Sequence, residues 1–231
     1  MMGNEISELG AIGVFAGLDG TAQARCARNA VRRPFSKGEM IFQQGDRPAR
    51  FHALLSGWVR IMQAGPDGGV SVVRFVGPGE PFGSFALFTD KGYPADAIAA
   101  VEGVELSWSE AQLRQLIEQY PLIAMNLVAV AARRLEELQE RVREISTQRA
   151  EPRIANVLLR LAHKGSEPRQ GGGIEMQMPL ARKDIAAMSA TTLHTASRTM
   201  FAWQRRGIVV SIGQRISIIN PSELKRMGDG V

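Results

Sequence analysis

The residues best suited to chemistry lie near the C-terminal end of the chain, on a helix predicted over residues 191–206. Five side chains recur there at helical spacing and share one face, and all but the phenylalanine are polar: His194, Ser197, Arg198, Phe201 and Arg205. An arginine can bind guanine through two hydrogen bonds in a DNA major groove, and a serine hydroxyl can bond a base or a phosphate. A histidine ring can donate or accept a hydrogen bond, and its C–H edge can approach a thymine methyl group. This face therefore predicts contact with the edges of DNA bases.

The rest of this segment is suited to packing and to binding phosphate. The predicted inward stripe is apolar and consists of Leu193, Ala196, Met200 and Trp203. Thr191 and Thr192 stand at the helix start, where hydroxyl groups and free N–H groups suit a phosphate. Arg182 and Lys183 open a preceding helix, predicted over 181–188, and are further candidates for phosphate contacts.

The elements around this helix predict a winged helix-turn-helix. Residues 181–188 and 191–206 form two helices joined by a tight turn, and residues 207–210 and 215–219 follow as a hairpin through Gly213. Residues 147–231 carry 13 Lys and Arg against 6 Asp and Glu, whereas residues 1–146 carry 15 against 17. The positive balance of the C-terminal part fits a polyanionic partner. A solvated basic surface is the alternative that charge alone leaves open.

A long helix before this region predicts a homodimer. Six apolar residues follow one another at intervals of 3, 4, 3, 4 and 3 residues, which is the spacing of a coiled coil: Val128, Ala131, Leu135, Leu138, Val142 and Ile145. The other faces of the helix are charged. A single helix packed on its own domain is the alternative. We call these six residues the seam.

The N-terminal part predicts a β-sandwich or barrel. Short apolar stretches between residues 31 and 108 alternate with turn signals, among them Ser56-Gly57 and Glu102-Gly103, the second of which predicts a hairpin. Asp19 can cap a helix over 19–29, Ser109 and Gln112 form a capping box, and residues 165–173 are predicted to be a loop. The fold class is α+β. The predicted domains are a sensor domain (1–118), a dimerisation helix (119–147) and a DNA-binding domain (148–231).

Composition excludes several classes of protein. The chain of 231 residues is 45% hydrophobic, and no apolar run approaches the roughly 18 residues that span a bilayer. Its start lacks a secretory signal, so we expect a soluble cytoplasmic protein without membrane contact. A single cysteine, Cys26, rules out a disulfide framework and an intrachain four-cysteine metal site. The sequence shows no catalytic triad, metal-spaced cluster or phosphate loop, and so predicts neither catalytic nor metal-binding residues and no enzyme.

In this order of elements, the chain resembles the CRP/FNR family of bacterial transcription regulators. The resemblance covers nearly the whole chain, and the segments that carry it are residues 35–46, 51–60, 78–83, 182–186, 195–198 and 203–209. The resemblance implies a cyclic-nucleotide-binding-like β-roll of the jelly-roll type, a dimerisation helix and a winged helix-turn-helix. It also implies a transcription activator that binds a pseudo-palindromic site in double-stranded DNA as a homodimer and contacts RNA polymerase. The residues themselves do not distinguish activation from repression.

Two departures concern the signal. The cyclic-AMP-binding branch has a glutamate where this chain has Ser84, after Gly83, and an Arg-Ser pair where it has Pro94-Ala95. Proline carries neither a charge nor a side-chain donor, so cyclic AMP is not expected as an effector. The region of Gly83, Ser84, Phe85, Pro94 and Ala95 is the predicted effector pocket. The oxygen-sensing branch holds an iron–sulfur cluster through several cysteines, which this chain lacks.

A third departure is His194, where most of the family has glutamate. This helix and residues 83–86 are similar to those of the nitric-oxide-responsive NnrR type, which implies a signal from nitric oxide or from redox and nitrogen-oxide metabolism. Haem remains an alternative cofactor, with His52 or His163 as a ligand. Two other functions stay open: a small-molecule sensor whose basic module docks a protein partner, and a regulator that answers a cyclic nucleotide.

Overall fold

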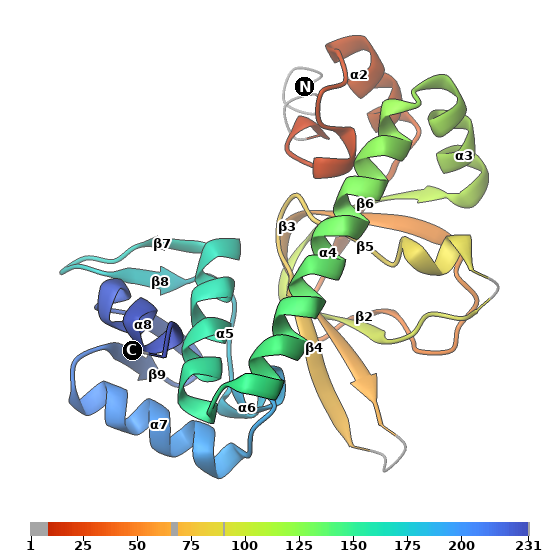
Figure 1. Cartoon of the computed structure of the whole chain (residues 1–231). Helices are drawn as coiled ribbons and strands as arrows, with labels where there is room; N and C mark the ends of the chain where they lie inside the picture. Colours follow the sequence, from red (N-terminus) through yellow and green to blue (C-terminus); the bar gives the residue numbers. More distant parts are fainter. Residues whose placement is uncertain (1–8, 66–68, 90, 231) are drawn as a thin grey trace. The chain divides into compact units, whose positions relative to one another are not determined.

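The computed structural model describes residues 9–65, 69–89 and 91–230, without the side chains of Phe85 and Ala86 (Figure 1). It confirms the predicted fold class, with an antiparallel β-domain followed by helices and a winged helix-turn-helix. The chain divides into two compact units, residues 1–63 with 76–137 and residues 64–75 with 138–231. The long helix contributes its first part to one unit and its last part to the other.

The first unit contains most of a six-stranded antiparallel sheet, of which residues 64 and 70–75 fall in the second unit. A 3-10 helix, η1 (Gly13–Phe15), and α2 (Gly20–Arg28) precede it, and Asp19 caps α2 as predicted, accepting a hydrogen bond of 2.8 Å from the amide of Ala22. The sheet runs in the order β1-β6-β3-β4, with β2 paired to β6 and β5 paired to β3. Its strands are β1 (Val31–Phe35), β2 (Met40–Phe42), β3 (Arg50–Ala64), β4 (Val70–Val76), β5 (Pro81–Phe82) and β6 (Asp96–Ser109).

The predicted hairpin at Glu102-Gly103 and the turn at Ser56-Gly57 are both wrong. β3 and β6 are continuous strands of 15 and 14 residues that pair with each other through register shifts between Leu54 and Val59. The backbones approach so closely there that a Cβ atom on Gly103 would lie 2.0 Å from the Ser56 carbonyl oxygen. Glycine therefore permits a close crossing of two long strands at this point, where the sequence predicted chain reversal.

Two helices close this unit. A 3-10 helix, η2 (Phe85–Phe88), lies between β5 and β6, and α3 (Glu110–Gln119) follows β6. The predicted capping box is confirmed, because the Ser109 hydroxyl accepts from the Gln112 amide and the Gln112 side chain accepts from the Ser109 amide. Trp108 anchors the core beneath these helices against Phe15 and Phe51, and its indole N–H donates to the Cys26 carbonyl at 2.9 Å.

The long helix, α4 (Leu122–Thr147), keeps its seam in solvent. Five of the six seam residues are 42–63% exposed: Val128, Leu135, Leu138, Val142 and Ile145. Ala131 is half-buried. An apolar stripe at coiled-coil spacing that is left exposed fits a second helix as its partner.

The second unit contains the winged helix-turn-helix (Figure 1). The predicted helices and wing are confirmed, while the predicted loop over 165–173 contains a strand and α8 was not predicted. A four-stranded sheet in the order β7-β8-β10-β9 supports the wing. The elements are α5 (Ala150–Lys164), β7 (Ser166–Pro168), β8 (Ile174–Met176), α6 (Arg182–Met188), α7 (Leu193–Arg205), β9 (Val209–Ile212), β10 (Arg215–Ile218) and α8 (Pro221–Gly228).

The sequence did contain a signal for α8. Asn220 caps this helix by accepting a hydrogen bond of 3.0 Å from the Glu223 amide, and Pro221 occupies its first turn. Asparagine, then proline, then glutamate is a typical helix start.

Exchanging Leu138 for glutamate is expected to convert the protein to a monomer. In a coiled coil the two glutamates would face each other in an apolar contact, where like charges repel and lose their hydration. Because Leu138 is 54% exposed in the single chain, the fold itself should survive. Light scattering at micromolar concentration should give a mass near 25.2 kDa for Leu138→Glu and near twice that for the parent.

The matched control is Gln139→Glu, which adds the same charge one residue away, off the seam. This variant should remain dimeric. A dimeric mass for Leu138→Glu, or a monomeric mass for both variants, would show that the seam is not the interface.

Candidate functional site

The helix pair α6 and α7 presents most of the predicted polar face to solvent. His194, Arg198 and Arg205 on α7 are exposed, and Ser197 is half-buried beside them. The opposite side of α7 is fixed in the core by Ala196, Met200 and Trp203, each of which is fully buried. The Trp203 indole N–H also donates to Glu151 of α5 at 2.9 Å. The polar side chains therefore project from a helix whose rotation is fixed.

Leu193 departs from its predicted inward position and is 54% exposed. It is the first residue of α7, one turn before the helix meets its core at Ala196. Phe201 lies on the outer face as well and is 62% exposed. The outer face of α7 thus combines cationic, hydroxyl and apolar groups, and apolar groups can contact thymine methyl groups.

The predicted phosphate-binding residues differ in their exposure and in the hydrogen bonds that they already make within the protein. Thr192 caps α7 by accepting from the Thr195 amide at 3.1 Å, and its side chain lies 3.0 Å from the Thr195 hydroxyl. The Thr191 amide donates to the Ala186 carbonyl at 2.9 Å. Lys183 is exposed, whereas Arg182 is half-buried and donates to the Gln204 side chain at 2.9 Å. Burial lowers the pKa of Arg182 from the ordinary arginine value.

The residues predicted to form one effector pocket do not all line the same cavity. Ser84 is buried and lines an apolar cavity of about 530 Å³, together with residues of α3 and α4. Gly83, with φ of 68°, faces Phe42, His52 and Tyr93 instead. Pro94 is exposed, Ala95 is buried, and neither is among the residues lining this cavity. The side chain of Phe85 lies outside the described residues.

This cavity reaches the seam. Its apolar walls include Ile117 of α3 and, on α4, Leu127, Val128 and Ala131, of which the last two belong to the seam. Arg114 and Glu118 bring charge to it. A molecule bound in the cavity would therefore touch two residues of the α4 stripe directly.

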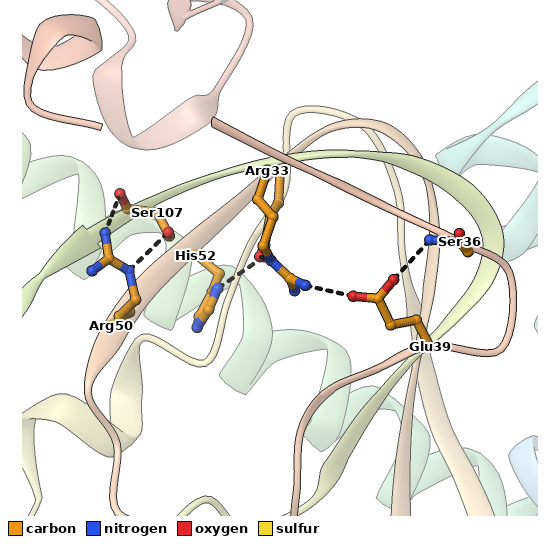
Figure 2. Close-up of polar contacts among 7 residues, drawn as sticks. Arg33, Ser36, Glu39, Arg50, His52 and Ser107 are labelled. Atoms are coloured by element: carbon orange, nitrogen blue, oxygen red, sulfur yellow. Dashed lines mark hydrogen bonds and ion pairs between the residues drawn. The ribbon is translucent and has the colours of Figure 1, made fainter. Parts of the chain in front are cut away.

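Sequence reasoning missed a buried polar network in the β-domain (Figure 2). Glu105 on β6 is 1% exposed; its carboxylate shares a hydrogen bond of 2.9 Å with Nδ1 of His52 and accepts one of 2.7 Å from Nε of Arg33. Arg33 also pairs with Glu39, which accepts from the Ser36 amide at 2.9 Å. β6 contains three acidic residues, Asp96, Glu102 and Glu105, and the sequence gives no signal that Glu105 is the buried one.

The network fixes the charge of Glu105. Burial on its own raises the pKa of this carboxyl, but the hydrogen bond with His52 and the hydrogen bond and positive charge of Arg33 outweigh burial, so that the pKa lies below that of an ordinary glutamate. A second arginine, Arg50, donates to the hydroxyl and the carbonyl of Ser107 at 2.8 and 2.9 Å (Figure 2).

The candidate haem ligands do not fit that role. His52 is buried, its Nδ1 is bound to Glu105, and its ring stacks on Phe82 at a centroid distance of 5.1 Å. His163 is exposed on α5. No histidine, cysteine or methionine lines the cavity beside Ser84, and no group of three potential metal ligands occurs among the described residues.

Cys26 is equally unsuited to sensing by its thiol. It is fully buried, and burial raises the pKa of its thiol to about 11. At neutral pH only about one such thiol in ten thousand is the reactive thiolate.

Across the part of the chain that the structure describes, no helix has the length and apolar character needed to cross a membrane.

Comparisons with known proteins match both units. A model of the cyclic nucleotide-binding domain matches residues 32–120, and a model of the Crp-like helix-turn-helix domain matches residues 152–227. The cyclic AMP receptor protein of Thermus thermophilus is 31% identical over 178 residues, covering 77% of this chain and 79% of the relative.

Two further similarities are to a curated relative and to a solved structure. The nitrogen fixation regulation protein FixK of Rhizobium meliloti is 30% identical over 194 residues, covering 84% of this chain and 85% of the relative. The solved structure of FixK2 from Bradyrhizobium japonicum has a TM-score of 0.74 at 23% identity and covers 86% of this chain and 96% of that one. The latter likeness concerns the fold.

Replacing Glu105 with glutamine is expected to destabilise the β-domain at neutral pH by about 2–4 kcal/mol, because His52 and Arg33 lose their buried acceptor. Since the folded-state pKa of Glu105 is lowered, its stabilising effect is complete above the unfolded pKa of about 4.3 and is lost as pH falls through the folded value. The difference in melting temperature between parent and Glu105→Gln should therefore shrink below about pH 4.

Glu102→Gln, an exposed position on the same strand, is the control and should leave the melting temperature unchanged. A deficit for Glu105→Gln that stays constant from neutral pH down to about pH 3 would show that the charge of Glu105 is not what stabilises the network.

Proposed function

The chain belongs to the CRP/FNR family of DNA-binding transcription regulators, and we propose that it reads a pseudo-palindromic operator as a homodimer under the control of a signal other than a cyclic nucleotide. We assign residues 1–118 to sensing, 119–147 to dimerisation and 148–231 to DNA binding. In this role the protein works in the cytoplasm and contacts RNA polymerase.

The proposal that the protein reads DNA rests on one observation, the exposed polar side chains on the outer face of α7. His194, Arg198 and Arg205 are exposed on a helix whose other face is buried, so their direction is set by the core. A helix of this kind fits the major groove, with residues near its N-terminus closest to the bases. Arg198 is the proposed guanine reader, Ser197 and His194 read or support neighbouring bases, and Arg205 meets the backbone.

Phosphate contacts are expected around the start of each helix. Lys183 is exposed and can reach a phosphate, and Thr191 and Thr192 stand just before α7, whose first-turn N–H groups suit a phosphate. Arg182 contributes charge near the DNA while its side chain is bound to Gln204. These contacts fix the position of the protein on the duplex without selecting a sequence.

The exposed seam supports the homodimer. Two copies joined along α4 would present two α7 helices to half-sites about one helical turn apart, and a two-fold symmetric protein matches a pseudo-palindromic site. The interface residues are those of the seam: Val128, Ala131, Leu135, Leu138, Val142 and Ile145.

The residues around Ser84 support a signal other than cyclic AMP. A cyclic phosphate needs a cationic anchor, and Pro94-Ala95 provides none. The similarity to the NnrR type makes nitric oxide, or a product of nitrogen-oxide metabolism, the first signal to test. Because the Cys26 thiol is buried and the His52 ring is buried and bound to Glu105, we propose that the signal acts through the apolar cavity beside Ser84, whose wall includes Val128 and Ala131.

His194→Glu should change which bases the protein prefers without much change in overall affinity. A glutamate accepts from cytosine, whereas imidazole does not impose that preference. The expected swing is about 1–3 kcal/mol at one base pair of each half-site, while the guanine contacted by Arg198 is kept. Selection of bound sites from a randomised DNA pool, with parent and variant at one salt concentration, measures this.

Arg198→Ala serves as the control and should lose the guanine preference. If parent and His194→Glu select identical motifs, His194 is not a base reader. If the parent selects no motif at all, the DNA-reading function itself is refuted. Binding that falls steeply with salt would separate phosphate contacts from docking to a protein partner.

Cyclic AMP is expected to leave the melting temperature and the DNA affinity unchanged. A ligand present at about 100 times its dissociation constant adds about 2.7 kcal/mol of stability, which is readily detected as a shift in melting temperature. The Thermus thermophilus cyclic AMP receptor protein, measured in parallel, is the positive control. A comparable shift in this protein would show that another basic residue replaces the missing arginine.

A further inference from the structure

One arginine of α5 joins the ends of two other helices. The Arg153 side chain donates from Nε to the Ser189 carbonyl at 2.9 Å and from one terminal nitrogen to the Ala190 carbonyl at 3.0 Å. Its other terminal nitrogen donates to the Gln148 carbonyl at 2.9 Å and to the Ile145 carbonyl at 3.5 Å. All three nitrogens of the guanidinium are thus engaged with backbone oxygen atoms.

These four carbonyls lie at or just beyond the carboxyl ends of α4 and α6. The last carbonyls of a helix have no partner within the helix and carry its partial negative charge, so that a cation there is favourable. Ile145 is in the last turn of α4 and Gln148 follows the helix, while Ser189 and Ala190 follow α6. The planar fork of arginine, with five N–H donors, can serve both ends at once, which a lysine cannot do.

The α6 end that Arg153 binds is also the turn of the helix-turn-helix. Ala190 has φ of 50° and is the one described residue other than glycine with positive φ. An L-residue with a side chain adopts this left-handed conformation only at an energetic cost, so the surrounding contacts must hold it there. Thr192, the cap of α7, follows two residues later. The direction in which α7 leaves the turn therefore depends on Ala190.

A second arginine binds the same end of α6 from α4. Arg141 donates to the Ala187 carbonyl at 3.2 Å. Three carbonyls of the α6 end, at Ala187, Ser189 and Ala190, thus receive arginine donors from α4 or α5. Their contacts and those of Arg153 with Ile145 and Gln148 tie the turn to the last two turns of α4.

We propose that Arg153 is a positioning residue for DNA recognition, which holds the strained turn at Ala190 against the end of α4 and so sets the direction of α7. Arg153 itself does not touch DNA in this scheme. The proposal rests on the proposed function for its effect on operator binding. Its effect on the turn concerns the free protein alone.

The test compares Arg153→Lys, which keeps the charge but loses the fork, with Arg149→Lys, the same exchange at an exposed position beside the start of α5. In the free full-length protein, hydrogen exchange of the peptide covering residues 186–194 should become about ten-fold faster for Arg153→Lys and stay unchanged for Arg149→Lys. Affinity for the site that the parent selects should fall about ten-fold, whereas affinity for random DNA should change by less than about two-fold.

Adding Ala190→Gly to Arg153→Lys provides a rescue variant, because glycine adopts the left-handed conformation without strain. The double variant should recover most of the exchange protection and part of the operator affinity. It also keeps the proposal testable if Arg153→Lys alone folds poorly, since the double variant should then regain the circular dichroism spectrum and melting transition of the parent.

Unchanged exchange in Arg153→Lys, an equal loss of affinity for operator and random DNA, or a double variant no better than Arg153→Lys would each overturn the proposal. If the parent selects no DNA site, the proposed function fails, while the exchange measurement still decides whether Arg153 holds the turn.

Discussion

The constraint on which this molecule depends is an apolar stripe that a single chain leaves in water. Five seam residues of α4, from Val128 to Ile145, are 42–63% exposed, and burying the remaining surface of each favours association by about 1 kcal/mol. Charged faces flank the stripe and limit which side of the helix can be covered. In the proposed homodimer, the contact that removes these side chains from water would also set the distance between two α7 helices, so that stability and DNA reading would share one interface.

The proposed effector cavity and the turn before the recognition helix α7 both involve residues of α4. Ala131 of α4 lines the cavity beside Ser84, and the carbonyl of Ile145, 14 residues later, accepts a hydrogen bond from Arg153. Under the proposed function, α4 is the element through which a ligand in the cavity would act on the arginine donors that bind the turn before α7.

What the sequence could predict was local, and what it could not predict came from pairing at a distance. The helical spacing of apolar residues correctly predicted α7 and its buried residues Met200 and Trp203. The coiled-coil spacing of the seam correctly predicted the long helix α4. The hairpin predicted at Gly103 was wrong, because glycine is equally common in a turn and where two strands cross closely. Only the position of the Ser56 backbone opposite Gly103 distinguishes the two, and a sequence does not show it. The partners Arg33 and Glu105 are 72 residues apart, and their pairing depends on the register of β1 with β6. The contacts of Arg153 are hidden for another reason, because backbone carbonyls leave no signature in a sequence.

A ligand in the cavity can act only through a difference between two packings of α4. If it covered about 100 Å² more apolar surface in one packing than in the other, it would favour that packing by about 2.5 kcal/mol, a shift in population of about ten- to a hundred-fold. The buried network of Glu105 is unsuited to provide such a difference, because its charges are already paired and removing one partner is costly. The apolar wall at Val128 and Ala131 is better suited, since side chains there can exchange a ligand for a neighbouring helix at little cost in polar contacts.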